Sequence, residues 1–159
     1  MILSKRTWLI ISGIKWLGIG VMLLTKGLRL ITSAAEQISV EAPLIKAFQS
    51  FAGSRHQSAL LIICLGLFIG FIKGRTVLSK TVGRIADRIN LHPGSLSLKE
   101  AYDQKYWIVI GLMMGLGMMF KFLPISIDIR GGIDVAIGSA LINGAMLYFR
   151  RIVAPQAKV

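Results

Sequence analysis

Four long apolar stretches constrain the fold of this chain more than any other feature. They cover residues 8–25, 57–72, 106–120 and 135–149, and Lys15 is the one charged residue inside them. Each approaches the ~20 residues that a helix needs to cross a hydrocarbon core about 30 Å thick. We therefore expect an all-α integral membrane protein with four transmembrane helices.

Residues suited to a membrane interface border these short stretches. They are Trp8, Trp16, Tyr106, Trp107, Tyr148, Lys26, Lys73, Lys121 and Arg150. Interfacial aromatic rings and snorkelling basic side chains lengthen a short span. Hydrophobic residues make up 54% of the 159 residues, and the mean hydropathy is +0.68, so we expect a single membrane domain over residues 1–159.

The distribution of basic residues predicts how the chain is oriented. The net charge is +12, and seven of the Lys and Arg residues fall between the second and third spans, at Lys73, Arg75, Lys80, Arg84, Arg88, Lys99 and Lys105. The positive-inside rule places this loop and both termini in the cytoplasm, with the spans in a bacterial-type plasma membrane. Basic and aromatic residues do not alternate as in nucleic-acid-binding proteins, so we expect no nucleic-acid partner.

Two amphipathic segments lie between the spans. After Pro43, apolar residues recur at helical spacing from Leu44 to Ala52, which predicts a helix on the outer membrane interface. A re-entrant pore helix or a lid over a site are the alternatives.

The second amphipathic segment belongs to a cytoplasmic helix and loop over residues 75–105. Lys80, Arg84 and Arg88 recur every fourth residue on one face. These side chains are expected to contact anionic lipid headgroups, which contributes roughly 1 kcal/mol per basic residue. Docking of a soluble partner is the alternative.

The spans contain a weak internal repeat. Gly18–Met22 resembles Gly115–Met119, and an offset of 77 residues pairs Gly66 with Asn143. The repeat units would be residues 8–74 and 106–151, which makes two tandem hairpins related by an axis along the membrane normal. Small residues four apart, such as Gly66 and Gly70, predict close helix packing within the chain or between subunits of a homo-oligomer.

Two polar residues inside spans form a first candidate site. Lys15 is seven residues beyond Trp8, and Asn143 is seven before Arg150, so both are expected about 10 Å below the cytoplasmic surface. Together they would form a polar or anion-attracting position in a ligand or ion pathway. Alternatively, Lys15 reaches the headgroups and Asn143 bonds a neighbouring helix.

A second candidate site lies at the outer ends of the spans. Lys26, Lys121 and Arg130 are expected there, together with Asp134 in the first turn of the fourth span. Ion pairing at the interface is one interpretation. A basic vestibule for an anion or a lipid phosphate is the other.

The sequence offers no basis for catalysis or for a metal site. Met113, Met114, Met118 and Met119 are better explained by packing than by copper binding, and Cys64 lies alone inside the second span. No nucleophile with its base, no paired intramembrane carboxylates and no phosphate-binding loop occurs. We therefore expect neither an enzyme nor a cofactor.

These features predict a small oligomeric channel or transporter-like protein for an ion or small anionic solute. Its partners would be membrane lipid, further copies of the chain or another membrane protein. The alternatives are a non-catalytic accessory or scaffold subunit of a larger membrane complex, and a lipid-binding membrane protein.

Overall fold

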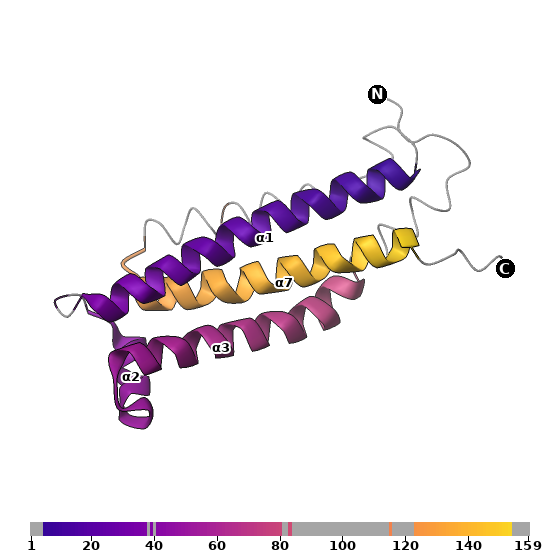
Figure 1. Ribbon diagram of the computed structural model, residues 1–159. Coiled ribbons are helices and arrows are strands. Elements are labelled where there is room, and N and C mark those ends of the chain that lie inside the picture. Colours follow the sequence, from indigo (N-terminus) through magenta and orange to yellow (C-terminus); the bar gives the residue numbers. More distant parts are fainter. Residues whose placement is uncertain are drawn as a thin grey trace.

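The computed structural model describes residues 5–37, 39, 41–80, 83, 115 and 123–153, which are helical almost throughout. The elements in chain order are α1 (Lys5–Glu36), α2 (Pro43–Ala52), α3 (Arg55–Lys73), the π-helix η1 (Gly74–Leu78) and α7 (Ile127–Val153) (Figure 1). No strand occurs among the described residues, so the expectation of an all-α protein is confirmed for this part of the chain.

Within the described part of the chain, three helices are long and apolar enough to cross a membrane. The candidate spans are Leu9–Glu36, Arg55–Val77 and Ile127–Arg150. They contain the first, second and fourth of the expected spans. The expected third span, residues 106–120, lies outside the described residues except for Gly115, and so do the predicted site residues Arg84, Arg88 and Lys121.

The first span is longer than its charge pattern predicts. The expected span ends at Thr25, but α1 continues for another eleven residues to Glu36. Ile31, Ala34 and Ala35 in this extension are buried, and no Gly-Pro break interrupts the helix. The lysine expected to end the span, Lys26, therefore lies within a continuous helix.

The three long helices lie side by side, with α7 between α1 and α3 (Figure 1). α1 runs antiparallel to α7, whereas α3 runs parallel to it. α2 lies across one end of the bundle. We call this the α2 end, where α1 finishes and α7 begins, and we call the opposite end the η1 end.

Glycines bring α1 and α7 into close contact. A Cβ atom added at Gly27 would lie 2.7 Å from the Val135 backbone nitrogen, and one added at Gly138 would lie 2.6 Å from the Leu24 nitrogen. Gly20 meets Ile142 and the Gly138 carbonyl in the same way. These α1 glycines are seven residues apart, so they recur on one face and allow the two backbones to touch.

Small residues also join α3 to α7. A Cβ atom added at Gly66 would lie 3.0 Å from Val135 Cγ1, and Gly70 packs against the Ala136 carbonyl. Gly74, one turn further on, packs against Ala140. The close approach predicted from the small-residue spacing is confirmed for α3, and the contact is made within one chain.

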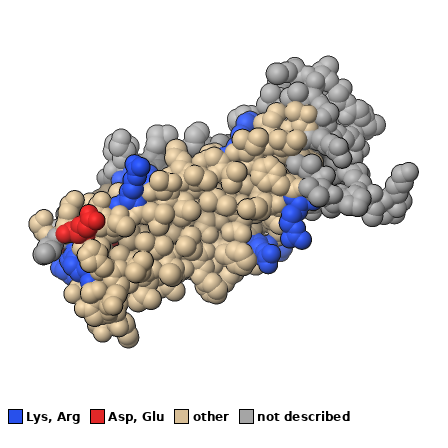
Figure 2. Space-filling view, viewed as in Figure 1, with Lys and Arg blue, Asp and Glu red and all other residues tan. Residues whose placement is uncertain are grey.

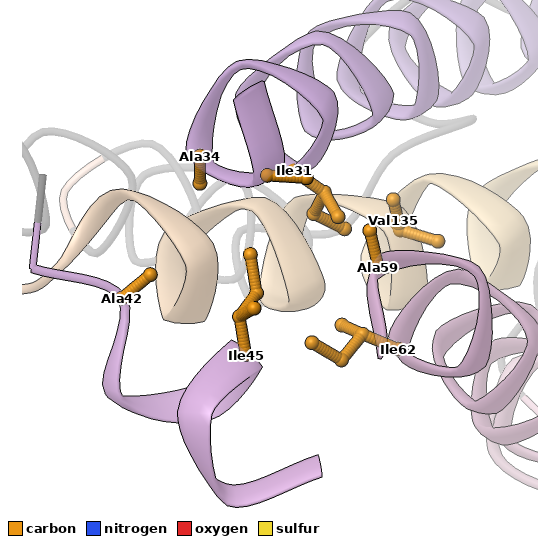
Figure 3. Packing of buried hydrophobic residues seen from close by; sticks show 8 residues of the cluster. Ile31, Ala34, Ala42, Ile45, Ala59, Ile62 and Val135 are labelled. Carbon is orange, nitrogen blue, oxygen red and sulfur yellow. The ribbon is translucent and has the colours of Figure 1, made fainter. Parts of the chain in front are cut away.

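A cluster of buried apolar side chains occupies the α2 end of the bundle. It comprises Ile31, Ala34, Ala35, Ala42, Ile45, Ala59, Ile62 and Val135 (Figure 3). The side chains come from α1, α2, α3, α7 and the segment before α2. α2 is therefore packed onto the bundle by part of the apolar face that its sequence predicts: Ile45 is fully buried and Leu44 and Phe48 pack beside it, whereas Phe51 is 88% exposed.

Candidate functional site

An ion pair joins α1 and α7. Lys26 Nζ lies 3.0 Å from Asp134 Oδ2, and the side chains are 45% and 14% exposed respectively. The next residue, Val135, contacts Gly66 near the middle of α3. The pair is therefore level with the middle of α3, well inside the bundle, whereas the sequence placed both residues at the ends of spans.

Two arginines lie one turn from this pair toward the α2 end. Arg29 follows Lys26 by three residues, and Arg130 precedes Asp134 by four, which puts each arginine on the same side of its helix as its paired neighbour. Arg29 is exposed and Arg130 is half-buried. The four side chains together carry a net charge of +2.

Lys15 and Asn143 lie on different surfaces of the bundle. The Asn143 side-chain nitrogen donates to the Ser139 carbonyl at 2.9 Å, and its Cβ packs against Gly74 of η1. Lys15 is exposed on α1. No described contact joins them, so a ligand site shared by these two residues stays a prediction.

A buried carboxylate, Asp128, holds α2 in place. Asp128 Oδ2 accepts hydrogen bonds from the backbone N–H groups of Leu44 at 2.7 Å and Ile45 at 3.1 Å. Its side chain is fully buried. Because the N-cap residue of α2 is Ala42, which makes no side-chain cap, Asp128 of α7 satisfies these donors and places a negative charge at the helix N-terminus.

The C-terminus of α1 is capped from outside in a similar way. Arg55 donates to the carbonyls of Ala34 at 2.7 Å, Ala35 at 3.2 Å and Gln37 at 3.1 Å. α1 has no basic residue in its own last turn. The sequence signal for both caps is a helix end that lacks its local capping residue, but this signal does not identify the distant partner.

A polar stripe runs along α1 on the side turned away from the bundle. Its members follow alternating spacings of three and four residues, and all are exposed: Lys15, Gly18, Met22, Thr25, Arg29, Thr32 and Glu36. A Cβ atom added at Gly18 would meet no atom within 4 Å. We call this set the outward stripe, and its charged and hydroxyl groups contrast with the apolar environment expected around a membrane helix.

The remaining candidates form no further cluster. Lys80 is exposed near the η1 end, and Cys64 is exposed on α3. Among the described residues, no three His, Cys, Asp or Glu side chains gather as metal ligands would.

Comparison with known proteins identifies no relative. No protein-family model matches the chain, and no curated protein or solved structure matches it. The functional proposal therefore rests on the helices, the Lys26–Asp134 pair and the outward stripe.

Proposed function

We propose that α1, α3 and α7 cross a membrane and that the chain crosses it a fourth time between α3 and α7. The parallel course of α3 and α7 supports this, because the connecting residues must return from the η1 end to the α2 end (Figure 1). On the face seen in Figure 2, Lys and Arg side chains lie toward the two ends and leave an uncharged band between them.

Four crossings put both termini on one side, and the basic excess favours the cytoplasm of a bacterial-type cell. Cysteines introduced at Gln49 and Lys80, in a Cys64→Ser background, test this arrangement. An impermeant thiol reagent should label position 49 in intact cells and position 80 only after permeabilisation. Labelling of both positions from one side would contradict the topology.

The chain acts as a non-catalytic accessory or scaffold subunit that associates through α1 with another membrane protein. The outward stripe carries this proposal. A charged residue at the centre of a membrane helix costs about 2.5–3.5 kcal/mol on insertion scales. Arg29, seven residues before the end of α1, and its polar neighbours would meet part of that cost if they faced lipid, and a protein partner that covers the stripe removes it.

The exposed face of α3 provides the contrast. Between residues 60 and 72 its exposed residues are apolar apart from Cys64, as a lipid contact requires: Leu60, Leu61, Leu65, Leu67, Phe68, Ile69, Phe71 and Ile72. The two surfaces thus differ in chemistry although both are open. α3 is suited to lipid, and α1 is suited to protein.

Photocrosslinking in native membranes tests the proposal with a matched pair of positions. Met22 is 61% exposed on the outward stripe, and Phe68 is 62% exposed on α3. A benzophenone side chain at Met22 should give discrete adducts with a second membrane protein, whereas the same group at Phe68 should give lipid adducts. The adduct at Met22 should also disappear when Gly18→Leu blocks close approach. Lipid adducts at both positions would overturn the proposal.

An oligomeric channel or transporter for a small anion is the second candidate. The Lys26–Asp134 pair and its flanking arginines favour it, because intramembrane charges are typical of ion and solute pathways. Rings of Arg29 or Lys15 from several copies would attract anions.

Flux measurements separate this candidate from the first. Folded protein in liposomes should release chloride or other small anions, and Arg130→Gln should reduce that flux relative to the Lys73→Gln control outside the cluster. An absence of flux across a broad panel of anions and cations would contradict the channel and leave the accessory subunit unaffected.

The cytoplasmic segment adds a proposed contact with anionic headgroups through Lys80, Arg84 and Arg88. Each basic residue would contribute roughly 1 kcal/mol near the surface of an anionic membrane. Fluorescence of a probe at position 80 should change more in phosphatidylserine vesicles than in phosphatidylcholine vesicles. Equal signals would argue against this contact.

A further inference from the structure

Arg29 has no counterion among the described residues, unlike its neighbour Lys26. Lys26, one turn away, pairs with Asp134. Arg29 is exposed, and its side chain makes no ion pair among the described residues. The guanidinium therefore presents a positive charge on the outward stripe that no described residue compensates.

The position of Arg29 in the helix keeps its charge away from the membrane surface. It precedes the last residue of α1, Glu36, by seven residues, which is about 10 Å along the axis. Helical side chains lean toward the helix N-terminus, so Arg29 extends from the α2 end toward the middle of the bundle. Lys15 is nearer the η1 end of α1. Its side chain leans toward that end, where it can reach the lipid headgroups.

A second copy of the chain does not provide the missing anion. Glu36 is the only acidic residue of α1. Two copies inserted in the same direction would bring one Arg29 beside the other when their outward stripes met. Like charges at one depth repel, so self-association through this stripe is disfavoured.

Gly18 provides room for a partner helix. It is the described α1 glycine at which an added Cβ would meet nothing within 4 Å, whereas Gly13, Gly20 and Gly27 are filled by α7. It lies eleven residues before Arg29, which is about three turns, so the two residues share a face. Small residues at such positions let two membrane helices approach closely.

We infer that the outward stripe docks a transmembrane helix of another protein, which packs at Gly18 and carries a carboxylate at the depth of Arg29. This rests on the proposed accessory function and adds the chemistry of the partner. A carboxylate and a guanidinium form two parallel hydrogen bonds, which fixes both the depth and the rotation of the partner helix.

Synthetic membrane peptides test the inference on the full chain. The protein is labelled at Cys64, its only cysteine, and is reconstituted into phosphatidylcholine vesicles. Three acceptor-labelled apolar helices are compared: one without acid, one with a glutamate at the depth of Arg29, and one with the glutamate moved to the depth of Met22. Energy transfer should report about tenfold tighter association for the second peptide than for the others.

Variants of the chain test the carboxylate contact at Arg29 and the helix packing at Gly18 separately. Arg29→Gln should remove the preference for the matched glutamate, and Lys73→Gln, an exposed cation on α3, should leave it unchanged. Gly18→Leu should weaken binding of all three peptides. Equal binding of the three peptides that still depends on Gly18 would overturn the carboxylate inference and leave the accessory function standing.

Two other outcomes would contradict the docking of a different protein on the outward stripe. Peptide association that is independent of both Arg29 and Gly18 would contradict the docking surface and the proposed function together. Energy transfer between separately labelled copies of the chain, lost in Gly18→Leu, would show that a second copy occupies the stripe instead of a different protein.

Discussion

The two faces of α1 have the same sequence period and opposite chemistry. Toward α7, small residues recur every seventh position at Gly13, Gly20, Gly27 and Ala34, and all are buried. On the outward face, Lys15, Met22, Arg29 and Glu36 recur at the same interval, and all are exposed. A seven-residue period keeps a residue type on one side of a helix, so α1 presents two separate surfaces of different chemistry.

The comparison shows which kind of contact each surface supports. The inward face packs closely against α7, because Cβ atoms added to its glycines would lie within 3.0 Å of backbone or side-chain atoms of α7. The outward face combines one open position, Gly18, with charges that no described residue compensates. The inward contact is made within the chain, whereas the outward surface has no contact among the described residues that covers it, and we propose that a partner does.

Substitution of one glycine on each face gives the largest expected contrast. A Cβ at Gly27 would lie 2.7 Å from the Val135 nitrogen and 2.8 Å from the Gly131 carbonyl oxygen, which are backbone atoms that cannot move alone. Gly27→Ala should therefore lower the free energy of unfolding by an amount near the top of the roughly 1–3 kcal/mol range for overpacking.

Gly18→Ala is the matched control on the same helix. With no atom near its Cβ, it should raise the free energy of unfolding by about 0.5–1 kcal/mol through helix propensity. Denaturation in mixed micelles, followed by circular dichroism, measures both variants. Equal effects in the same direction would show that the two faces do not differ in packing as described.

Substitution of Asp128, which caps the N-terminus of α2, tests whether the backbone N–H groups there depend on a partner from α7. Asp128→Ala leaves the N–H groups of Leu44 and Ile45 without their acceptor and removes a charge from the N-terminus of α2. A loss of about 1–2 kcal/mol is expected, confined mostly to α2.

Hydrogen exchange measures the effect of Asp128→Ala residue by residue. The amides of Leu44 and Ile45 should exchange faster in the variant, while amides in the middle of α3 keep their protection. Asp128→Asn, which retains one oxygen acceptor, should have a smaller effect. Uniformly faster exchange would indicate that Asp128 supports the whole bundle.

Composition and periodicity alone predicted the helical class, three candidate spans among the four expected, and part of the buried face of α2. These properties depend on local patterns, such as the charge-free run before Lys73 and the stripe from Leu44 to Ala52. The small residues of α3 likewise predicted a close contact, since Gly66 and Gly70 share one face. Local patterns do not identify the helix on the other side of a contact.

The candidate site was harder to predict from the sequence, because it also depends on which helices contact one another. Treating Lys26 as the end of a span ignored the buried residues beyond it, so the depth of the Lys26–Asp134 pair was missed. Asp128 and Arg55 act on helix ends that are distant in sequence, and only the fold brings them there. The seven-residue spacing of the α1 glycines is present in the sequence and indicates a close helix contact on that face of α1, but it does not identify α7 as the partner.

The Lys26–Asp134 pair is expected to contribute less than the caps. Asp134→Asn removes the ionic attraction but keeps a polar group of similar size beside the ammonium. Because Lys26 is 45% exposed, solvent screens the pair, and a loss of about 0.5–1 kcal/mol is expected. A double-mutant cycle with Lys26→Met measures the coupling. A coupling energy near zero would mean that the pair adds no stability within the bundle.

The hydroxyls of the outward stripe are expected to have the smallest effect. Thr25 Oγ1 donates to the Val21 carbonyl at 2.7 Å, and Thr32 Oγ1 donates to the Leu28 carbonyl at 3.0 Å, so both are satisfied by their own helix. Thr25→Val should change the free energy of unfolding by less than about 0.5 kcal/mol and leave peptide association intact. If Thr25→Val weakened association as much as Arg29→Gln does, the hydroxyls would contact the partner directly, and the specificity of the outward face would not reside in its charge.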